Sequence, residues 1–135
     1  MRWARGQALL ELALCAPVVV LLALGVAAVV QVQDAAAGLD AATTAAASVA
    51  SRAPDPITAD LAARARFASV VAAYPLRETA LHISLGSFSR ASDVSVTADA
   101  FVDVAWAGLV LPHRFHLHSR AVIQLEPWRT HRAKG

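Results

Sequence analysis

The sequence predicts an α+β fold: a long N-terminal membrane-spanning helix that continues outside the membrane, a second helix, and a three-stranded antiparallel sheet. Three patterns indicate this fold. An apolar run extends from Leu12 to Val30, an alanine-rich stretch without proline follows to Ala53, and apolar and polar residues alternate over much of the chain after residue 80. The 135 residues leave room for this helix and one small outer domain.

The apolar run has the length of a transmembrane helix. Its nineteen residues, Leu12–Val30, would extend about 28 Å as a helix, close to the thickness of a bilayer's hydrocarbon core. Arg2 and Arg5 precede the run, and positive residues before a span favour a cytoplasmic N-terminus, with the rest of the chain outside. We therefore expect residues 7–30 to form a transmembrane helix.

Glu11 is a carboxylate at the leading edge of this run, five residues after Gly6. Inside a membrane a carboxylate costs about 2.5 kcal/mol or more unless it finds a partner. A plain membrane anchor has no need of this charge, so Glu11 indicates a further role for the segment.

Residues 31–53 are expected to extend the first helix into water, because alanine is the best helix former. The single helix should run from about Gln7 to Ser51 and end before Pro54, since the residue before a proline disfavours the α conformation. Gly38 is expected to weaken it locally.

A second helix is predicted to begin at Asp55-Pro56, because aspartate caps helices and proline suits the first helical position. Its buried stripe is expected at helical spacing, before Pro75 ends the element. The stripe comprises Phe67, Val70, Val71 and Tyr74.

Three strands are predicted from alternating apolar residues that would share one face of a sheet. The first strand places there Leu81, Ile83 and Leu85. The second places there Val94, Val96, Ala98, Ala100, Val102, Val104 and Trp106, with Phe101 as an exception on the polar face. The third places there Phe115, Leu117, Ala121, Ile123 and Leu125, together with Ser119. Aspartate at Val96 or Ile123 should therefore unfold the outer domain.

The second and third strands are predicted to form a hairpin that turns between Gly108 and Pro112. The numbers of two residues that face each other across the hairpin would then add up to an odd number near 221. This register keeps both apolar faces on one side and places Asp103 opposite His118.

The charge pattern gives no indication of nucleic-acid binding. The net charge is +2, but Arg2 and Arg5 account for two of the twelve basic residues, and the remaining chain is balanced. Residues 129–135 form a basic tail that is typical of a solvated terminus. Cys15 is the single cysteine, so no intrachain disulfide can form.

His113, His116 and His118 raise the possibility of a metal site, with Asp99 or Asp103 as further ligands. A solvated strand face with a cross-strand Asp–His pair is the alternative that we favour, so no metal and no cofactor are expected. The chain also has no nucleophile, phosphate-loop or metalloprotease motif, which argues against an enzyme.

The apolar loop Leu109-Val110-Leu111-Pro112 leaves two interpretations open. It is either packed over the second helix or exposed for a partner.

The N-terminus resembles the pilin-like proteins of tight-adherence (Flp-type) pilus systems, the TadE-like pseudopilins. The residues that carry the resemblance are Arg5-Gly6-Gln7-Ala8, Leu10-Glu11-Leu12-Ala13-Leu14, Pro17 and the apolar run behind it. The family pattern is a short basic leader that ends in glycine, a glutamate five residues later and a long apolar helix with an early proline. Phenylalanine commonly follows the glutamate, and Leu12 departs from that pattern.

The resemblance implies a pilin-like fold and cleavage by a prepilin peptidase after Gly6, which makes residues 1–6 a removable leader and Gln7 the new N-terminus. It implies other pilins and the pilus assembly platform as further partners, with residues 12–30 in lipid. The outer domain would comprise residues 54–128. The implied function is assembly or priming of a pilus, or of a related secretion system, at the bacterial inner or cell membrane.

Two alternatives remain open. The chain could be an uncleaved single-pass anchor that displays a small binding domain. It could instead carry an ordinary secretory signal that is cleaved near Ala35-Ala36-Ala37, although nineteen apolar residues exceed the usual signal core of about 7–15.

Overall fold

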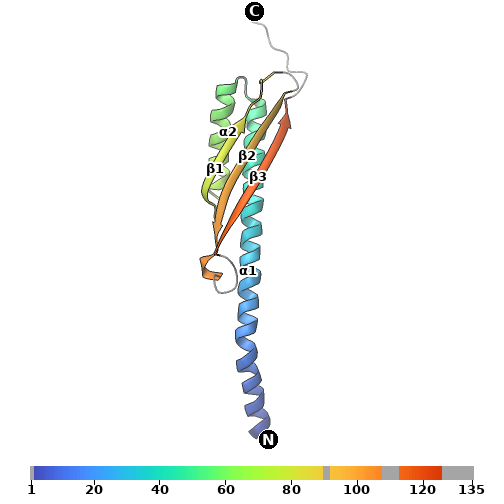
Figure 1. Cartoon of the computed structure of the whole chain (residues 1–135), viewed down its shortest axis with the longest axis vertical. Helices are drawn as coiled ribbons and strands as arrows, with labels where there is room; N and C mark the ends of the chain where they lie inside the picture. The colour runs from blue at the N-terminus through green and yellow to red at the C-terminus, as the bar shows by residue number, and fades with distance from the viewer. Residues whose placement is uncertain (1, 90–91, 108–112, 126–135) are drawn as a thin grey trace, which may run out of the picture.

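The computed structural model describes residues 2–89, 92–107 and 113–125, and it has the predicted α+β fold (Figure 1). In chain order the elements are α1 (Arg2–Arg52), α2 (Pro56–Val71), β1 (Arg77–Ser84), β2 (Asp93–Asp103), the short 3-10 helix η1 (Ala105–Ala107) and β3 (Arg114–Gln124). The predicted loop residues 109–112 and the basic tail 129–135 lie outside the described residues.

Helix α1 is continuous over 51 residues and has two halves with different surroundings. Its C-terminal half lies beside α2 and the sheet, whereas its N-terminal half extends beyond them (Figure 1). The predicted single helix is confirmed, although it begins at Arg2 and not at Gln7. The helix is long and apolar enough to cross a membrane.

Helix α2 begins as the sequence predicts. Oδ1 of Asp55 accepts a hydrogen bond of 2.8 Å from the backbone N–H of Thr58, and Pro56 occupies the first helical turn. The buried face is Ala59, Ala63 and Phe67, at steps of four residues. The predicted stripe is only partly correct, because Val70 is half-buried and Tyr74 lies beyond the last helical residue.

Gly38 has a different role from the expected helix weakening. A Cβ atom at this position would collide with the ring of Tyr74. The absence of a side chain therefore lets the ring of Tyr74, in the turn after α2, pack directly against α1, and Gly38 is a packing residue.

The sheet is antiparallel with strand order β1-β2-β3, as predicted. The predicted register of the β2–β3 pair is wrong by four positions: Asp99 is opposite His118, and Asp103 is opposite Arg114. The paired positions still sum to an odd number, so each side chain keeps its predicted face.

The register differs because the connection between β2 and β3 is longer than assumed. Strand β2 ends at Asp103, η1 follows, and the backbone N–H of Val104 donates to the carbonyl of His113 at 2.8 Å. Trp106 is therefore in η1 and not on the strand face, and 49% of its surface is exposed.

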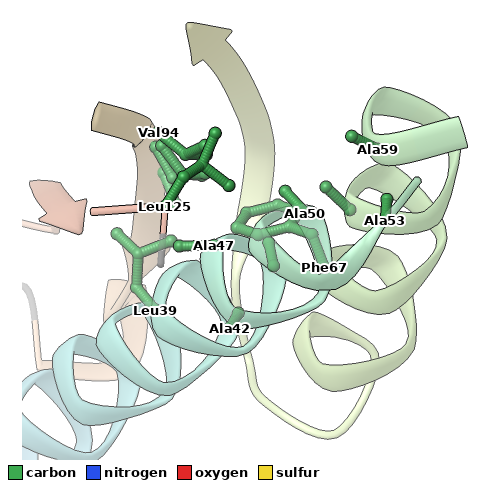
Figure 2. Packing of buried hydrophobic residues seen from close by; sticks show 14 residues of the cluster. Leu39, Ala42, Ala47, Ala50, Ala53, Ala59, Phe67, Val94 and Leu125 are labelled. Atoms are coloured by element: carbon green, nitrogen blue, oxygen red, sulfur yellow. The ribbon is translucent and has the colours of Figure 1, made fainter. Parts of the chain in front are cut away.

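The core lies between α1, α2 and the inner face of the sheet (Figure 2). Every even-numbered residue of β2 is fully buried, and so is Val104 directly after the strand. The two outer strands contribute half-buried residues that include Leu81 and Ile83 of β1 and Leu117 and Ile123 of β3. The helices contribute mostly alanine, which permits close approach of the backbones. The C-terminal half of α1 therefore belongs to the same domain as α2 and the sheet, which is called the outer domain below after its predicted position.

Candidate functional site

The residues of the predicted processing site all lie on the exposed N-terminal half of α1. Gly6, Gln7, Glu11, Leu12 and Pro17 are within one continuous helix, and all five are exposed. Gln7 and Glu11 are four residues apart, so they lie on the same side of the helix, one turn from each other. None of the five contacts the outer domain, and the segment is therefore accessible to a partner.

The packing of the chain gives no reason for glycine at position 6. A Cβ atom built on Gly6 would have no neighbour within 4 Å, in contrast to Gly38. Glycine within a helix is less favourable than alanine by about 1 kcal/mol. The contacts of the described residues therefore do not account for glycine at this position.

Glu11 has no hydrogen-bond or ion-pair partner among the residues that the structure describes. Arg5 and Arg2 are six and nine residues before it on the same helix. Its carboxylate is therefore free to pair with a group on another molecule, and in lipid such pairing would offset a cost of about 2.5 kcal/mol or more.

Pro17 lies inside α1 without ending it. Proline has no N–H, so the carbonyl of Ala13 has no donor from the following turn of the helix. In a membrane such a group needs another partner, which a neighbouring helix can supply.

The apolar surface of α1 is formed by side chains that the outer domain leaves uncovered. The exposed large residues within the apolar run are Leu12, Leu14, Val18, Val19, Val20, Leu21, Leu22, Val26, Val29 and Val30. An apolar surface of this length, free of charge, is typical of a helix that contacts lipid or other apolar helices.

The outer domain meets α1 where the apolar run ends. Nε1 of Trp106 donates a hydrogen bond of 3.0 Å to Oε1 of Gln31, the first polar residue after Val30. A groove of about 560 Å³ opens here, lined by Gln31, Pro75, Leu76, Arg77, Asp103, Ala105 and Trp106. The sequence predicts that the helix leaves lipid at about Gln31, but it gives no signal that Trp106 contacts this residue.

The histidines expected near an aspartate are found on the outer face of the sheet. Nδ1 of His118 donates to Oδ1 of Asp99 at 2.9 Å, and Nε2 of His116 lies 3.0 Å from the same oxygen. The hydrogen bond from His118 holds the pKa of the Asp99 carboxyl below its ordinary value. The predicted cross-strand Asp–His pair therefore exists, with Asp99 in place of Asp103.

Aromatic and cationic side chains extend this face toward the end of the sheet that carries η1. The rings of Phe101 and His116 are 5.1 Å apart between centroids, and the guanidinium of Arg114 lies 4.1 Å above the Phe101 ring. Arg114 also pairs with Glu78 of β1. Phe101, predicted as the one apolar residue on the polar face, is thus covered by its neighbours.

Within the described ranges 2–89, 92–107 and 113–125, no group of three histidine, cysteine or acidic residues could hold a metal ion. His116 and His118 share Asp99 as a hydrogen-bond acceptor. His113 directly precedes the first residue of β3, and its carbonyl accepts a hydrogen bond from the backbone N–H of Val104.

No protein-family model, curated protein or solved structure matches this chain.

Proposed function

We propose that this chain is a TadE-like pilin or pseudopilin, which a prepilin peptidase cleaves after Gly6 and which acts in the assembly or priming of a tight-adherence pilus or a related secretion system. The observation that carries the proposal is the division of α1 into two halves. One half packs into the outer domain, and the other presents an exposed apolar surface with an unpartnered Glu11 at its leading edge.

Gly6 supports peptidase processing. It lies on the uncovered part of α1, and the fold has no need for glycine there. A residue without a side chain lets an enzyme approach the backbone closely, and Arg2 and Arg5 would keep the cleavage site in the cytoplasm.

Glu11 gives the proposal its assembly mechanism. Cleavage would create an α-amine on Gln7, with an ordinary pKa of about 7.7–8.0, so that it carries positive charge near neutral pH. The Glu11 carboxylate of one subunit would pair with the Gln7 amine of a neighbour. A buried charge is tolerated when it is paired and strongly disfavoured alone, so this pair would select the correctly registered arrangement of helices.

The burial of Ala35 argues against release by an ordinary secretory signal. Cleavage near Ala35-Ala36-Ala37 would cut within α1, where Ala35 has no exposed surface and the helix is continuous with the part that packs into the core. An uncleaved anchor remains compatible with the fold, but it assigns no role to Glu11.

Substitutions at Glu11 test the proposal, because they should affect assembly with other pilins but not cleavage after Gly6. Glu11→Leu, produced together with the prepilin peptidase and the other pilus components, should still be cleaved after Gly6 but should no longer enter complexes with other pilins. Glu11→Asp is the matched control that keeps the charge, and it should retain part of the assembly. Normal assembly of the leucine variant would contradict the pairing of Glu11 with a neighbour.

A further inference from the structure

We propose that the end of the outer domain that carries η1 is a lipid-contact surface, where Trp106 and Arg77 meet the phospholipid headgroups of the membrane that α1 crosses. This inference needs α1 to span a bilayer, but it does not depend on pilus assembly or on cleavage after Gly6.

Trp106 lies at the level of α1 where the apolar run ends. Its indole N–H bonds to Gln31, the residue at which the nineteen-residue apolar run gives way to polar sequence. With Leu12–Val30 in the hydrocarbon core, Gln31 lies at the boundary with the headgroups. Tryptophan concentrates at this depth in membrane proteins, because its ring is apolar and its N–H needs a polar partner. The 49% exposure of Trp106 leaves half of its surface available to lipid.

Some residues of the apolar run are already buried within the protein. Ala28 has no exposed surface although it belongs to the predicted span, and Leu24 and Gly25 are half-buried. The neighbouring residues Val26, Val29 and Val30 stay exposed. One side of α1 is therefore already covered about 4.5 Å below Gln31, at the rise of 1.5 Å per residue. The domain cannot stand clear of the membrane when these residues are in lipid.

The orientation of the sheet agrees with this placement. Strands β2 and β3 run alongside α1, and η1 lies at the end of the sheet nearest the exposed half of the helix (Figure 1). The opposite end, where Asp93 pairs with Gln124, is farthest from the span.

The groove beside Trp106 supplies the chemistry that recognises a headgroup. Arg77 lines it and has no ion-pair partner among the described residues, whereas the nearby cation Arg114 is already held by Glu78. An arginine guanidinium binds phosphate through two parallel hydrogen bonds. Asp103 lines the same groove, where its Oδ1 accepts from the backbone N–H of Ala105 and its carboxylate can also accept from the amine of a zwitterionic headgroup. Phosphoethanolamine lipids carry both a phosphate and an amine, so they are the ligands that this pair of side chains would bind.

The test measures the depth of Trp106 in vesicles of phosphatidylethanolamine and phosphatidylglycerol. The full chain with Trp3→Phe and Trp128→Phe retains Trp106 as its single tryptophan. We expect lipids brominated in the upper acyl chain to quench Trp106 about twofold more than a tryptophan held away from the bilayer, as for a residue at the interface. Quenching no stronger than in that control would overturn the proposal.

Val122→Trp, in a chain whose three native tryptophans are phenylalanine, provides the matched control. Val122 is 51% exposed, close to the 49% of Trp106. It is opposite Ser95 and eight strand positions from the Asp103–Arg114 pair, which is about 27 Å along the sheet. Val19→Trp in the same background is the positive control, because it lies within the apolar run, and its quenching verifies insertion of α1.

Arg77→Gln tests the headgroup contact separately, with acrylamide as a neutral quencher from the aqueous side. We expect acrylamide to quench Trp106 more strongly in Arg77→Gln than in the parent. Arg120 is an exposed arginine in the middle of β3, and Arg120→Gln should leave the quenching unchanged. Equal effects of the two variants would overturn the role of Arg77.

Two further outcomes would also contradict the lipid assignment. If inorganic phosphate alone shifted the Trp106 emission of the detergent-solubilised chain, the groove would be a site for a soluble anion. If Trp106 were shielded from acrylamide without quenching by brominated lipid, a protein partner would cover it. Neither result would affect the test of Glu11.

Discussion

Oγ of Ser119 on β3 donates a hydrogen bond of 2.5 Å to Oδ1 of Asp40 on α1, which connects two residues 79 positions apart in the chain. Ser119 is 6% exposed and lies on the apolar face of the sheet between Leu117 and Ala121. The bond explains why a serine interrupts this face. It also links the C-terminal half of α1 directly to the last strand of the sheet.

Ser119→Ala should lower the free energy of unfolding of the outer domain by about 1.5–3 kcal/mol, the range for a hydrogen bond to a charged group. Urea unfolding of the full chain in detergent, with Trp3 and Trp128 replaced by phenylalanine so that fluorescence reports on Trp106, measures this loss. Asp40→Ala and the double variant complete a thermodynamic cycle. Strictly additive losses would show that the bond contributes nothing to stability.

Gly38→Ala should destabilise the domain even though alanine favours a helix by about 1 kcal/mol over glycine. The new methyl group would collide with the ring of Tyr74. Gly6→Ala is the matched control and should not reduce stability, because nothing lies within 4 Å of its added methyl group. The double variant Gly38→Ala, Tyr74→Ala should lose less stability than the two single losses added together, because the collision is absent without the ring. A loss equal to that sum would contradict this packing.

Local pattern was sufficient to predict most of the fold. Pro54 ends α1, Asp55 and Pro56 start α2, and the alternation from Val94 to Val102 assigns the buried face of β2. Each of these features depends on the chemistry of a few adjacent residues. They could therefore be derived without knowledge of the rest of the chain.

Features that depend on distant contacts could not be derived in the same way. The register of the β2–β3 pair depends on the length of the connection, and η1 has no distinct sequence signal. Helix propensity predicts only that Gly38 weakens α1, because nothing adjacent to it in the sequence indicates that Tyr74 packs against it. Motif spacing indicates the residues of the proposed processing site, and the fold adds that they are exposed and that Glu11 is unpartnered in the described chain.

Val96→Asp should unfold the outer domain, because Val96 is fully buried in the centre of β2 and a lone carboxylate there would have no partner. Thr97→Asp, the adjacent position on the outer face, is the matched control and should leave the domain folded. Ile123 is only half-buried, so Ile123→Asp should cost less than Val96→Asp, whereas the sequence pattern alone predicts unfolding by either change. Circular dichroism of all three variants checks the order, and comparable stability of Val96→Asp and Thr97→Asp would refute the assigned faces.

The Asp99–His118 hydrogen bond should make stability depend on pH at the acid end. The folded pKa of Asp99 is lowered from 3.8, so its contribution is present above the unfolded pKa and is lost as the pH falls through the folded one. Asp99→Asn should therefore show a shallower loss of stability below about pH 4 than the parent chain. Asp34→Asn on α1 is the control carboxylate. Unfolding curves recorded between pH 2 and pH 6 test this, and identical acid limbs for the parent and Asp99→Asn would exclude the contribution.

Intact-mass spectrometry of the membrane-extracted chain, after production with an active prepilin peptidase, identifies its N-terminal residue and so tests whether cleavage occurs after Gly6. We expect a chain that starts at Gln7, and one that starts at Met1 when the peptidase is inactive or when Gly6 is replaced by leucine. A start at Met1 with the active peptidase would indicate an uncleaved anchor, and a start in the mid-thirties would indicate an ordinary signal peptide. Either result would contradict the assignment of this chain as a processed, pilin-like subunit.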